Sequence, residues 1–359
     1  MVELIILDGR NFNIKDYTFS KNNNIIFDSL VQNSSTFNVN KLDLNVSNND
    51  ILITRGTTKQ YIGIVDSITK NNNVIKITTY QFYKKLELAF LGKSQVDIVL
   101  GDYLKKIIED NLIKSNDTLQ NITYLEVENK SQIRGAVSLT GNSSTNILNV
   151  ISQILKAYEL VINYNATFTE SGQLKGIKIL IEDVKKEIII KEKENFITNA
   201  EIVDGKIGAV NKLIFFPNED NILYKDTLTY YLLNDGTVTT NDQDDKRIVP
   251  VVVQSVFYQD ADIYYSSSSK SSDTLLAKAK EKFSSTTFNH YIKFTINKNN
   301  LIDINELNLG DRVKFISRNG KIYNSIITQL KYSSYSSQVE IELGLNRITL
   351  TDKLKMRGE

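Results

Sequence analysis

His290 is the only histidine in the chain, so a Ser–His–Asp nucleophilic site would have to use this residue. Apolar and polar residues alternate from Phe288 to Ile296, which predicts a strand with one buried face. His290 falls on the apolar side of that strand. We therefore interpret it as a core or interface histidine with satisfied hydrogen bonds, and not as a catalytic base.

The acidic cluster Asp242-Gln243-Asp244-Asp245 superficially resembles the first residues of a calcium-binding loop. Such a loop needs glycine at its sixth position and glutamate at its twelfth, where this chain has Arg247 and Val253. The cluster is therefore predicted to be a solvated acidic turn.

Other residue types that could do chemistry are missing or badly spaced. The chain has no cysteine, which excludes disulfides, thiolate zinc sites and cysteine nucleophiles. Glu182 and Asp183 are adjacent and would point to opposite faces of a strand, whereas a glycosidase needs two carboxyl groups that converge across a cleft. No phosphate-binding loop or dinucleotide fingerprint occurs. We predict no catalytic, cofactor-binding or metal-ligating residue, no cofactor, and no enzyme activity.

Charge and hydropathy narrow the class of protein further. The 359 residues include 43 basic and 42 acidic side chains, a formal net charge of +1. Free-standing nucleic-acid-binding proteins usually carry an excess of basic residues, so the balanced charge argues against this class of protein. No stretch approaches the ~18 uncharged apolar residues of a membrane span, and the first residues have no basic targeting segment. We expect a soluble protein made in a cytoplasm.

The elements that position these residues change along the chain. Residues 1–95 alternate short β-branched runs with Asn/Gly turns, which predicts an antiparallel meander. Residues 96–185 predict a small α+β unit, because apolar residues recur at helical spacing twice before a hairpin with its loop at Thr169–Gly172. Ser143, Ser144 or Thr145 would cap the second of these helices. Its apolar stripe is Ile147, Leu148, Ile151, Ile154, Leu155 and Tyr158, and the first helix has Leu100, Tyr103, Leu104, Ile107, Ile108 and Leu112.

The second half returns to strands. Residues 186–260 are predicted to be β-rich, with a hairpin at 229–239 whose turn is Asp235-Gly236. A helix at 272–285, capped by Ser272 or Asp273, follows a Ser-rich stretch. The chain then continues as strands to about residue 343.

The two meanders resemble each other. Asp50 and Asp311 each precede a strand, a turn, a longer strand, a polar turn and a final strand, and the spacing differs by only a few residues. Two interpretations are open. The similarity either reflects only the composition that antiparallel meanders share, or it means that the chain contains two copies of one β-barrel module.

The order of elements and three motifs carry a resemblance to a known family. These motifs are the Tyr-Leu-Leu-Asn-Asp-Gly hairpin at 231–236, the Leu-Leu-Ala-Lys-Ala-Lys helix at 275–280 and Leu-Gly-Asp-Arg-Val at 309–313. Nearly the whole chain resembles the tail hub, or tail-associated protein, of long-tailed phages and prophages. That family is similar to the central hub of contractile phage baseplates and of type VI secretion spikes.

The resemblance implies a mainly β fold with α+β insertions and two related, tube-like β-barrel modules, assembled as a homotrimeric ring. Residues 1–95 would form the first module, completed by strands from 186–235, and residues 96–185 would be an inserted domain. Residues 186–260 would be a β-rich connecting region. Residues 261–359 would form the second module, which would include the helix 272–285.

The same resemblance implies a structural protein of the virion tail tip, assembled in the bacterial cytoplasm and acting in genome ejection and host cell entry. Its partners would be the distal tail protein ring, the tape-measure protein and receptor-binding or tip proteins. Because the chain stops at Glu359, we expect no cell-wall-degrading domain. Residues 1–95 hold 11 basic and 8 acidic side chains and residues 301–359 hold 9 and 7, so we expect no stable nucleic-acid binding. The alternatives are a cell-wall hydrolase of the tail tip and a host saccharide-binding module.

Overall fold

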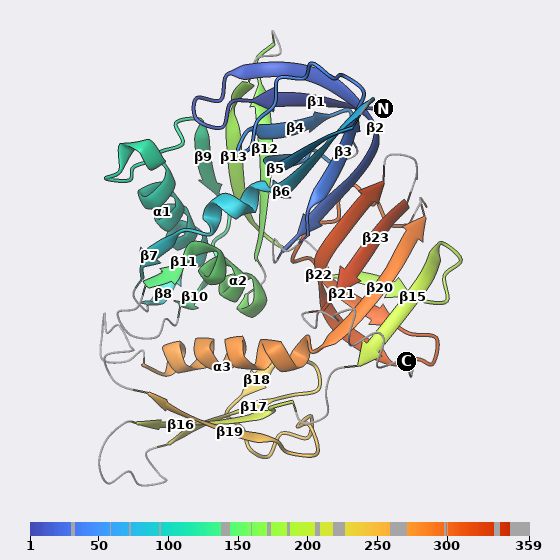
Figure 1. Cartoon of the computed structure of the whole chain (residues 1–359). Helices are drawn as coiled ribbons and strands as arrows, with labels where there is room; N and C mark the ends of the chain where they lie inside the picture. Colours follow the sequence, from blue (N-terminus) through green and yellow to red (C-terminus); the bar gives the residue numbers. More distant parts are fainter. Residues whose placement is uncertain are drawn as a thin grey trace.

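A closed six-stranded barrel forms the N-terminal part of the chain (Figure 1). In the computed structural model its strands follow the order β1-β4-β5-β6-β3-β2, and β1 pairs with β2 to close the ring. The interior is filled by β-branched and aromatic side chains, among them Ile53, Phe37 and Tyr61, all fully buried. The strands of this first barrel are β1 (Val2–Leu7), β2 (Ile14–Asp28), β3 (Ser35–Val39), β4 (Ile51–Arg55), β5 (Ile62–Asn71) and β6 (Val74–Gln81).

The structure describes most but not all of the sequence. The described residues are 1–29, 33–57, 59–71, 73–92, 95–137, 144–158, 160–170, 174–184, 187–204, 209–217, 227–258, 271–297, 299, 301–333 and 338–344. Most of the Ser-rich stretch and part of the loop at Thr169–Gly172 lie outside them.

A second six-stranded sheet is built from two distant parts of the chain, in the order β14-β21-β22-β23-β20-β15. It joins the first barrel edge to edge, because β2 pairs antiparallel with β22. The strands of this second sheet are β14 (Ile188–Lys191), β15 (Ile197–Asp204), β20 (His290–Asn297), β21 (Arg312–Ile316), β22 (Ile322–Ser333) and β23 (Gln338–Leu343).

Strand pairing here differs from the sequence-based expectation. Strands from 186–235 were expected to complete the first barrel, but β1, β2 and β3 close it from within residues 2–81. β14 and β15 instead extend the second sheet beside β21 and β20. The reason is that β2 is 15 residues long and can pair with β1, β3 and β22 along its length.

An insert of residues 82–184 packs beside the first barrel. Helix α1 (Leu100–Leu112) buries the stripe predicted from its spacing, apart from the half-buried Tyr103. Helix α2 (Ile147–Ala157) has Asn146 as its N-cap, and Oδ1 of Asn146 accepts the backbone N–H of Leu148 at 2.8 Å. The cap is therefore not one of the three preceding hydroxyl residues. The other elements are the 3₁₀ helices η1 (Phe82–Leu86) and η2 (Thr118–Gln120) and the strands β7 (Ala89–Leu91), β8 (Gln95–Val99), β9 (Leu125–Asn129), β10 (Arg134–Val137), β11 (Ser144–Asn146), β12 (Leu160–Phe168) and β13 (Leu174–Asp183).

A four-stranded sheet with one helix forms a separate unit, which we call the α3 unit. Helix α3 (Ser271–Thr287) was expected in the second barrel module, but Leu275, Ala279 and Phe283 share a core with Leu213 and Phe215 of this sheet. The hairpin predicted at 229–239 is present, and Gly236 has a φ of +86° in its turn. The strands, in the order β18-β17-β16-β19, are β16 (Lys212–Pro217), β17 (Leu228–Leu232), β18 (Val238–Thr239) and β19 (Val253–Tyr258).

One continuous core runs through the first barrel, the insert and the second sheet. The α3 unit has its own smaller core and lies apart from β1–β6 in Figure 1. Among the described helices, none combines the length and the apolar character that a membrane crossing needs.

Candidate functional site

The structure places His290 beside two residues of the types a nucleophilic triad needs. Its Nε2 lies 2.7 Å from Oγ of Ser325, and Asp204 is its partner across the β15–β20 ladder. His290 is only 6% exposed and Ser325 only 2%, so both side chains are buried. Burial lowers the pKa of His290 to about 4, with the Asp204 charge opposing that shift, and the ring is neutral near pH 7. The geometry is that of a buried histidine with a satisfied hydrogen bond.

The acidic residues singled out in the sequence bind backbone groups of their own turn or a nearby lysine. In the turn at 242–245, Asp244 accepts the backbone N–H of Lys246, and Arg247 donates to the backbone carbonyl of Asp242. Glu182 lies 3.8 Å from the ammonium of Lys130. Within the described residues no group of three or more His, Asp or Glu side chains could hold a metal ion.

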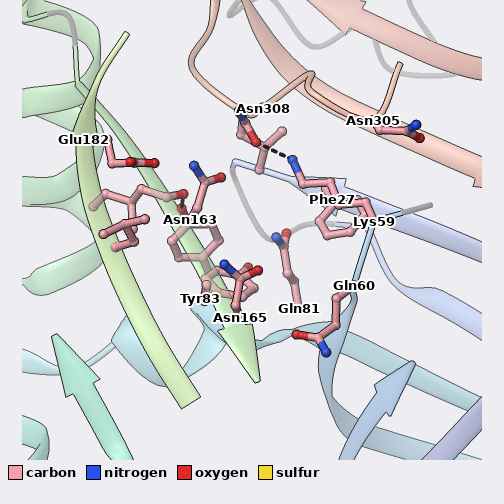
Figure 2. A pocket seen from close by; sticks show the side chains of 14 residues that line it. Phe27, Lys59, Gln60, Gln81, Tyr83, Asn163, Asn165, Glu182, Asn305 and Asn308 are labelled. Atoms are coloured by element: carbon pink, nitrogen blue, oxygen red, sulfur yellow. Dashed lines mark hydrogen bonds between the residues drawn. The ribbon is translucent and has the colours of Figure 1, made fainter. Parts of the chain in front are cut away.

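A polar cavity of about 300 Å³ lies where the first barrel, the insert and the second sheet meet (Figure 2). Its wall mixes amides with one ammonium and one carboxylate. The buried ring of Phe27 lies under the ammonium of Lys59, 5.5 Å from its centroid. The labelled lining residues are Phe27, Lys59, Gln60, Gln81, Tyr83, Asn163, Asn165, Glu182, Asn305 and Asn308.

The hydrogen bonds around this cavity join the three units. The Lys59 ammonium donates to the carbonyl of Leu307 at 2.7 Å and to Oδ1 of Asn308 at 2.5 Å (Figure 2). Gln60 Oε1 accepts the backbone N–H of Ala166 in β12 at 2.6 Å. Burial lowers the pKa of Lys59 to about 8, and the charge of Asp311 opposes that shift. These contacts describe a junction, because the Lys59 ammonium and the side-chain amides of Gln60 and Asn308 are already bound to protein groups.

The turn before β4 has a specific set of hydrogen bonds around Asp50. Its Oδ2 accepts the backbone N–H of Ser47 at 2.7 Å. Its carbonyl accepts the N–H of Val65 at 2.8 Å, and the N–H of Asn49 donates to the Val65 carbonyl at 2.7 Å. Asn49 has a positive φ of 69°, a conformation that asparagine and glycine tolerate.

The turn before β21 repeats this arrangement around Asp311. Its Oδ2 accepts the N–H of Asn308 at 2.8 Å. Its carbonyl accepts the N–H of Ile327 at 3.0 Å, and Gly310, with a φ of +89°, donates to the Ile327 carbonyl at 2.8 Å. Asp50 and Asp311 are both buried, at 4% and 8% exposure. The two aspartate turns are therefore the same local structure at two places in the chain.

The strands after each aspartate turn repeat as well. The order β4-β5-β6-β3-β2 in the first barrel corresponds to β21-β22-β23-β20-β15 in the second sheet, with antiparallel pairing throughout. β5 shifts register at Asp66 against β6, and β22 shifts at Thr328 against β23. The fully buried Phe37 and Phe294 occupy the same position opposite Ile77 and Ile341. Shared composition does not produce matching bulges, so the two segments are copies of one module.

One difference separates the copies. β1 runs antiparallel to β4, whereas β14 runs parallel to β21. The first barrel closes through β1 and β2, and the described strands of the second sheet include no such closing pair.

No protein-family model matches the sequence, and no curated protein matches it. Solved structures do match. Prophage tail protein gp18 from Listeria monocytogenes EGD-e is 15% identical, with a TM-score of 0.56 over 99% of this chain and 98% of that one. The 43 kDa tail protein of prophage MuSo2 from Shewanella oneidensis is 10% identical, with a TM-score of 0.54 over 95% and 98%.

The chain has the fold of a prophage tail protein. A tail protein from Neisseria meningitidis MC58 matches too, with 12% identity and a TM-score of 0.52 over 98% of each chain. Because these matches run over nearly the full length of both partners, the tail-protein fold includes the repeated modules, the insert and the α3 unit together. The expectation of a mainly β, tail-hub-like fold is confirmed.

Sequence reasoning found the aspartate turns but missed the residues that hold the units together. Lys59 lies in the polar turn before β5, where nothing in the local pattern separates it from a solvated lysine. Gln60 and Asn308 are equally inconspicuous. Their roles depend on which strands pair, and that information is not local.

Proposed function

We propose that the chain is a structural hub protein of a phage or prophage tail, without enzyme activity, and that three copies form a ring at the tail tip. The observation that carries this proposal is the repeated module with its matching aspartate turns. Three chains with two modules each supply six similar modules, a number that suits a six-fold tail partner on one face and a three-fold tip on the other.

The junction between the modules within one chain supports the ring. The first barrel and the second sheet join edge to edge and head to tail through β2 and β22. Head-to-tail contacts that are repeated by rotation close into rings. The same kind of contact between chains would continue the series.

We assign the two tube modules to residues 1–81 and to 187–204 together with 289–344. The insert 82–184 and the α3 unit 209–287 would lie outside the tube and offer the surfaces that bind other tail components. In the virion those partners would be the distal tail protein ring, the tape-measure protein and receptor-binding or tip proteins. The tube would conduct DNA during genome ejection and host cell entry without holding it, which agrees with the near-balanced charge of residues 1–95 and 301–359.

The mass of the purified chain in solution tests this proposal. We expect three times the 40.8 kDa of one chain by light scattering, with dissociation on dilution when the partners are absent. A mass that stays at one chain at high protein concentration, with no trimer in assembled tails, would overturn the ring. Release of sugar or peptide from cell walls by the purified chain would favour a hydrolase instead.

A further inference from the structure

Equivalent strands of the two modules differ in which of their edges are paired with another strand. In β22, Gln329 pairs with Glu342 of β23 on one side and with Asp28 of β2 on the other. In β2, Asn24 likewise pairs with Thr36 of β3 and with Ser333 of β22. Both strands of this internal contact are therefore paired on both edges.

The equivalent of β22 in the first barrel is β5. Its inner half pairs with β4 at Ile62–Ile64, and its outer half pairs with β6 as far as Asn71. The other edge of that outer half, which corresponds to the β2-binding edge of β22, is not paired with any strand the structure describes. Most of the outer half, from Asp66 to Asn71, is exposed.

The equivalent of β2 in the second sheet is β15. Register through Phe37 and Phe294 places Glu201 where the first barrel has Asn24. β15 pairs with β20 on one edge, and among the described strands none pairs with its other edge. Figure 1 shows β15 at the outer margin of the second sheet, so this edge faces away from the rest of the chain.

The two left-over edges are the two halves of the contact that β2 and β22 make. Unpaired strand edges are templates for pairing with another chain. We propose that β15 of one copy pairs antiparallel with the outer half of β5 of a second copy and so repeats the β2–β22 contact between chains. In this register Glu201 lies opposite Asn71, Ile202 opposite Lys70, and Val203 opposite Thr69. This contact rests on the proposed ring and names the surface through which its subunits join.

Side-chain directions agree with that register. Ile25 and Phe27 of β2 belong to the core, and Ile202 of β15 packs against the same core. Its neighbour Val203 therefore points to the opposite face of the sheet. Ile68 also packs against the core, so Thr69 points outward, onto the face that Val203 shares.

The proposed contact between chains has an oppositely charged pair where the internal contact has an aromatic pair. Inside the chain Phe27 and Tyr332 form a diagonal edge-to-face pair with centroids 5.8 Å apart. Their equivalents across the proposed contact are Asp204 and Lys70, which carry opposite charges. Diagonal neighbours on one face of an antiparallel pair are within reach of long side chains. The partner that these two edges fit is a second copy of the chain.

A cysteine pair tests the register, because the chain contains no cysteine of its own. The variant with Val203→Cys and Thr69→Cys puts two thiols at directly opposed positions, a spacing that a disulfide can bridge. After mild oxidation we expect covalent trimers on a non-reducing gel. A mixture of the two single variants should give covalent pairs and nothing larger, since each contact joins one thiol at position 203 to one thiol at position 69.

Two matched variants calibrate the result. The internal equivalent, Ile26→Cys with Lys331→Cys, should lose its free thiols without any gain in size. The slipped pair, Val203→Cys with Lys70→Cys, puts the thiols on opposite faces and should not cross-link.

The outcomes separate the contact from the ring. A chain that light scattering finds trimeric, but in which the 203–69 pair does not cross-link while the internal pair does, overturns the β15–β5 contact and leaves the ring standing. Cross-linking of the slipped pair at an equal rate also overturns the register. A chain that stays monomeric and does not cross-link overturns both the contact and the ring.

Discussion

At the scale of single residues, Asp50 and Asp311 carry the most information. Each is buried, and each binds the backbone three residues earlier with one carboxylate oxygen. Their charges have different neighbours, since Lys15 binds Asp50 at 2.7 Å and Lys59 lies near Asp311. The turn is thus a conformational requirement that both modules meet, while the lysines tie each copy to its own surroundings.

Lys59 gives the chain a predicted pH dependence. Its pKa in the folded chain is lowered to about 8, mainly by burial, from an ordinary value of 10.5. Below pH 8 both the folded and the unfolded chain carry the proton. Between pH 8 and 10.5 the unfolded chain keeps a proton that the folded chain has lost, so this lysine makes the free energy of unfolding rise with pH.

The Lys59→Met variant should lack that rise. The slope of the free energy of unfolding against pH, measured by denaturant titration at one protein concentration, should differ from the parent by at most about 1.4 kcal/mol per pH unit between pH 8 and 10.5. Lys76→Met, at an exposed position on β6, should retain the parent slope. Equal slopes for the parent and Lys59→Met would contradict the burial of a charged ammonium at the junction.

At the scale of elements, α2 illustrates what local pattern can and cannot predict. The apolar stripe fixes the helix to within a residue or two, because its spacing depends only on the helical period. From the sequence alone, this stripe predicts that Leu148, Ile151 and Leu155 are buried against the hairpin that follows, residues 160–181. Helix α2 does contact β12 of that hairpin, and the same three side chains also line a small cavity with Leu309 and the Ile326–Ile327 segment of the second sheet. That surface is about 170 residues away in sequence, and a helical pattern does not name its partner.

Alanine substitutions in α2 follow from this placement. Ile151 is 1% exposed, and its replacement by alanine should lower the free energy of unfolding by roughly 2–5 kcal/mol. Leu148 and Leu155 are only partly buried, so each of their alanine variants should lose less than Ile151→Ala. Denaturant melts of the three variants, with the exposed Asn149→Ala as the control, check the order. A loss below about 1 kcal/mol for Ile151→Ala would contradict its place in the core.

The two meanders were predictable for a related reason, and their completion was not. The aspartate turn, the hairpins and the bulged long strand are all local, so two similar local patterns indicated two similar structures. β14 and β15 lie more than 85 residues before β20 in sequence and pair with strands around it. Which strands pair over such distances depends on which strand edges are unpaired and on how the side chains pack in the core. The same non-local choice hides Lys59 and the α3 core from sequence reasoning.

At the scale of the whole molecule, one chain supplies two of the similar modules that follow one another around the proposed ring. Its internal contact buries an aromatic pair, and the proposed contact between chains has Asp204 and Lys70 in the same places. An aromatic contact is insensitive to salt, whereas an exposed charge pair is screened with a Debye length of about 10 Å at 0.1 M salt. The modules within a chain should therefore stay joined under conditions in which the chains separate.

A double-mutant cycle on Lys70→Met and Asp204→Asn measures that difference. Asp204 also binds Lys321 within its own chain at 2.6 Å, but the cycle cancels this contact because Lys70 takes no part in it. Analytical ultracentrifugation of the four forms should give a coupling energy of about 0.2–1 kcal/mol per contact, the range of exposed ion pairs. The coupling should fall as salt rises. Lys76→Met paired with Asp204→Asn should be additive, because β6 residue 76 lies outside the proposed contact. A zero coupling for Lys70 and Asp204 at low salt would mean that these two side chains do not meet when the chains assemble.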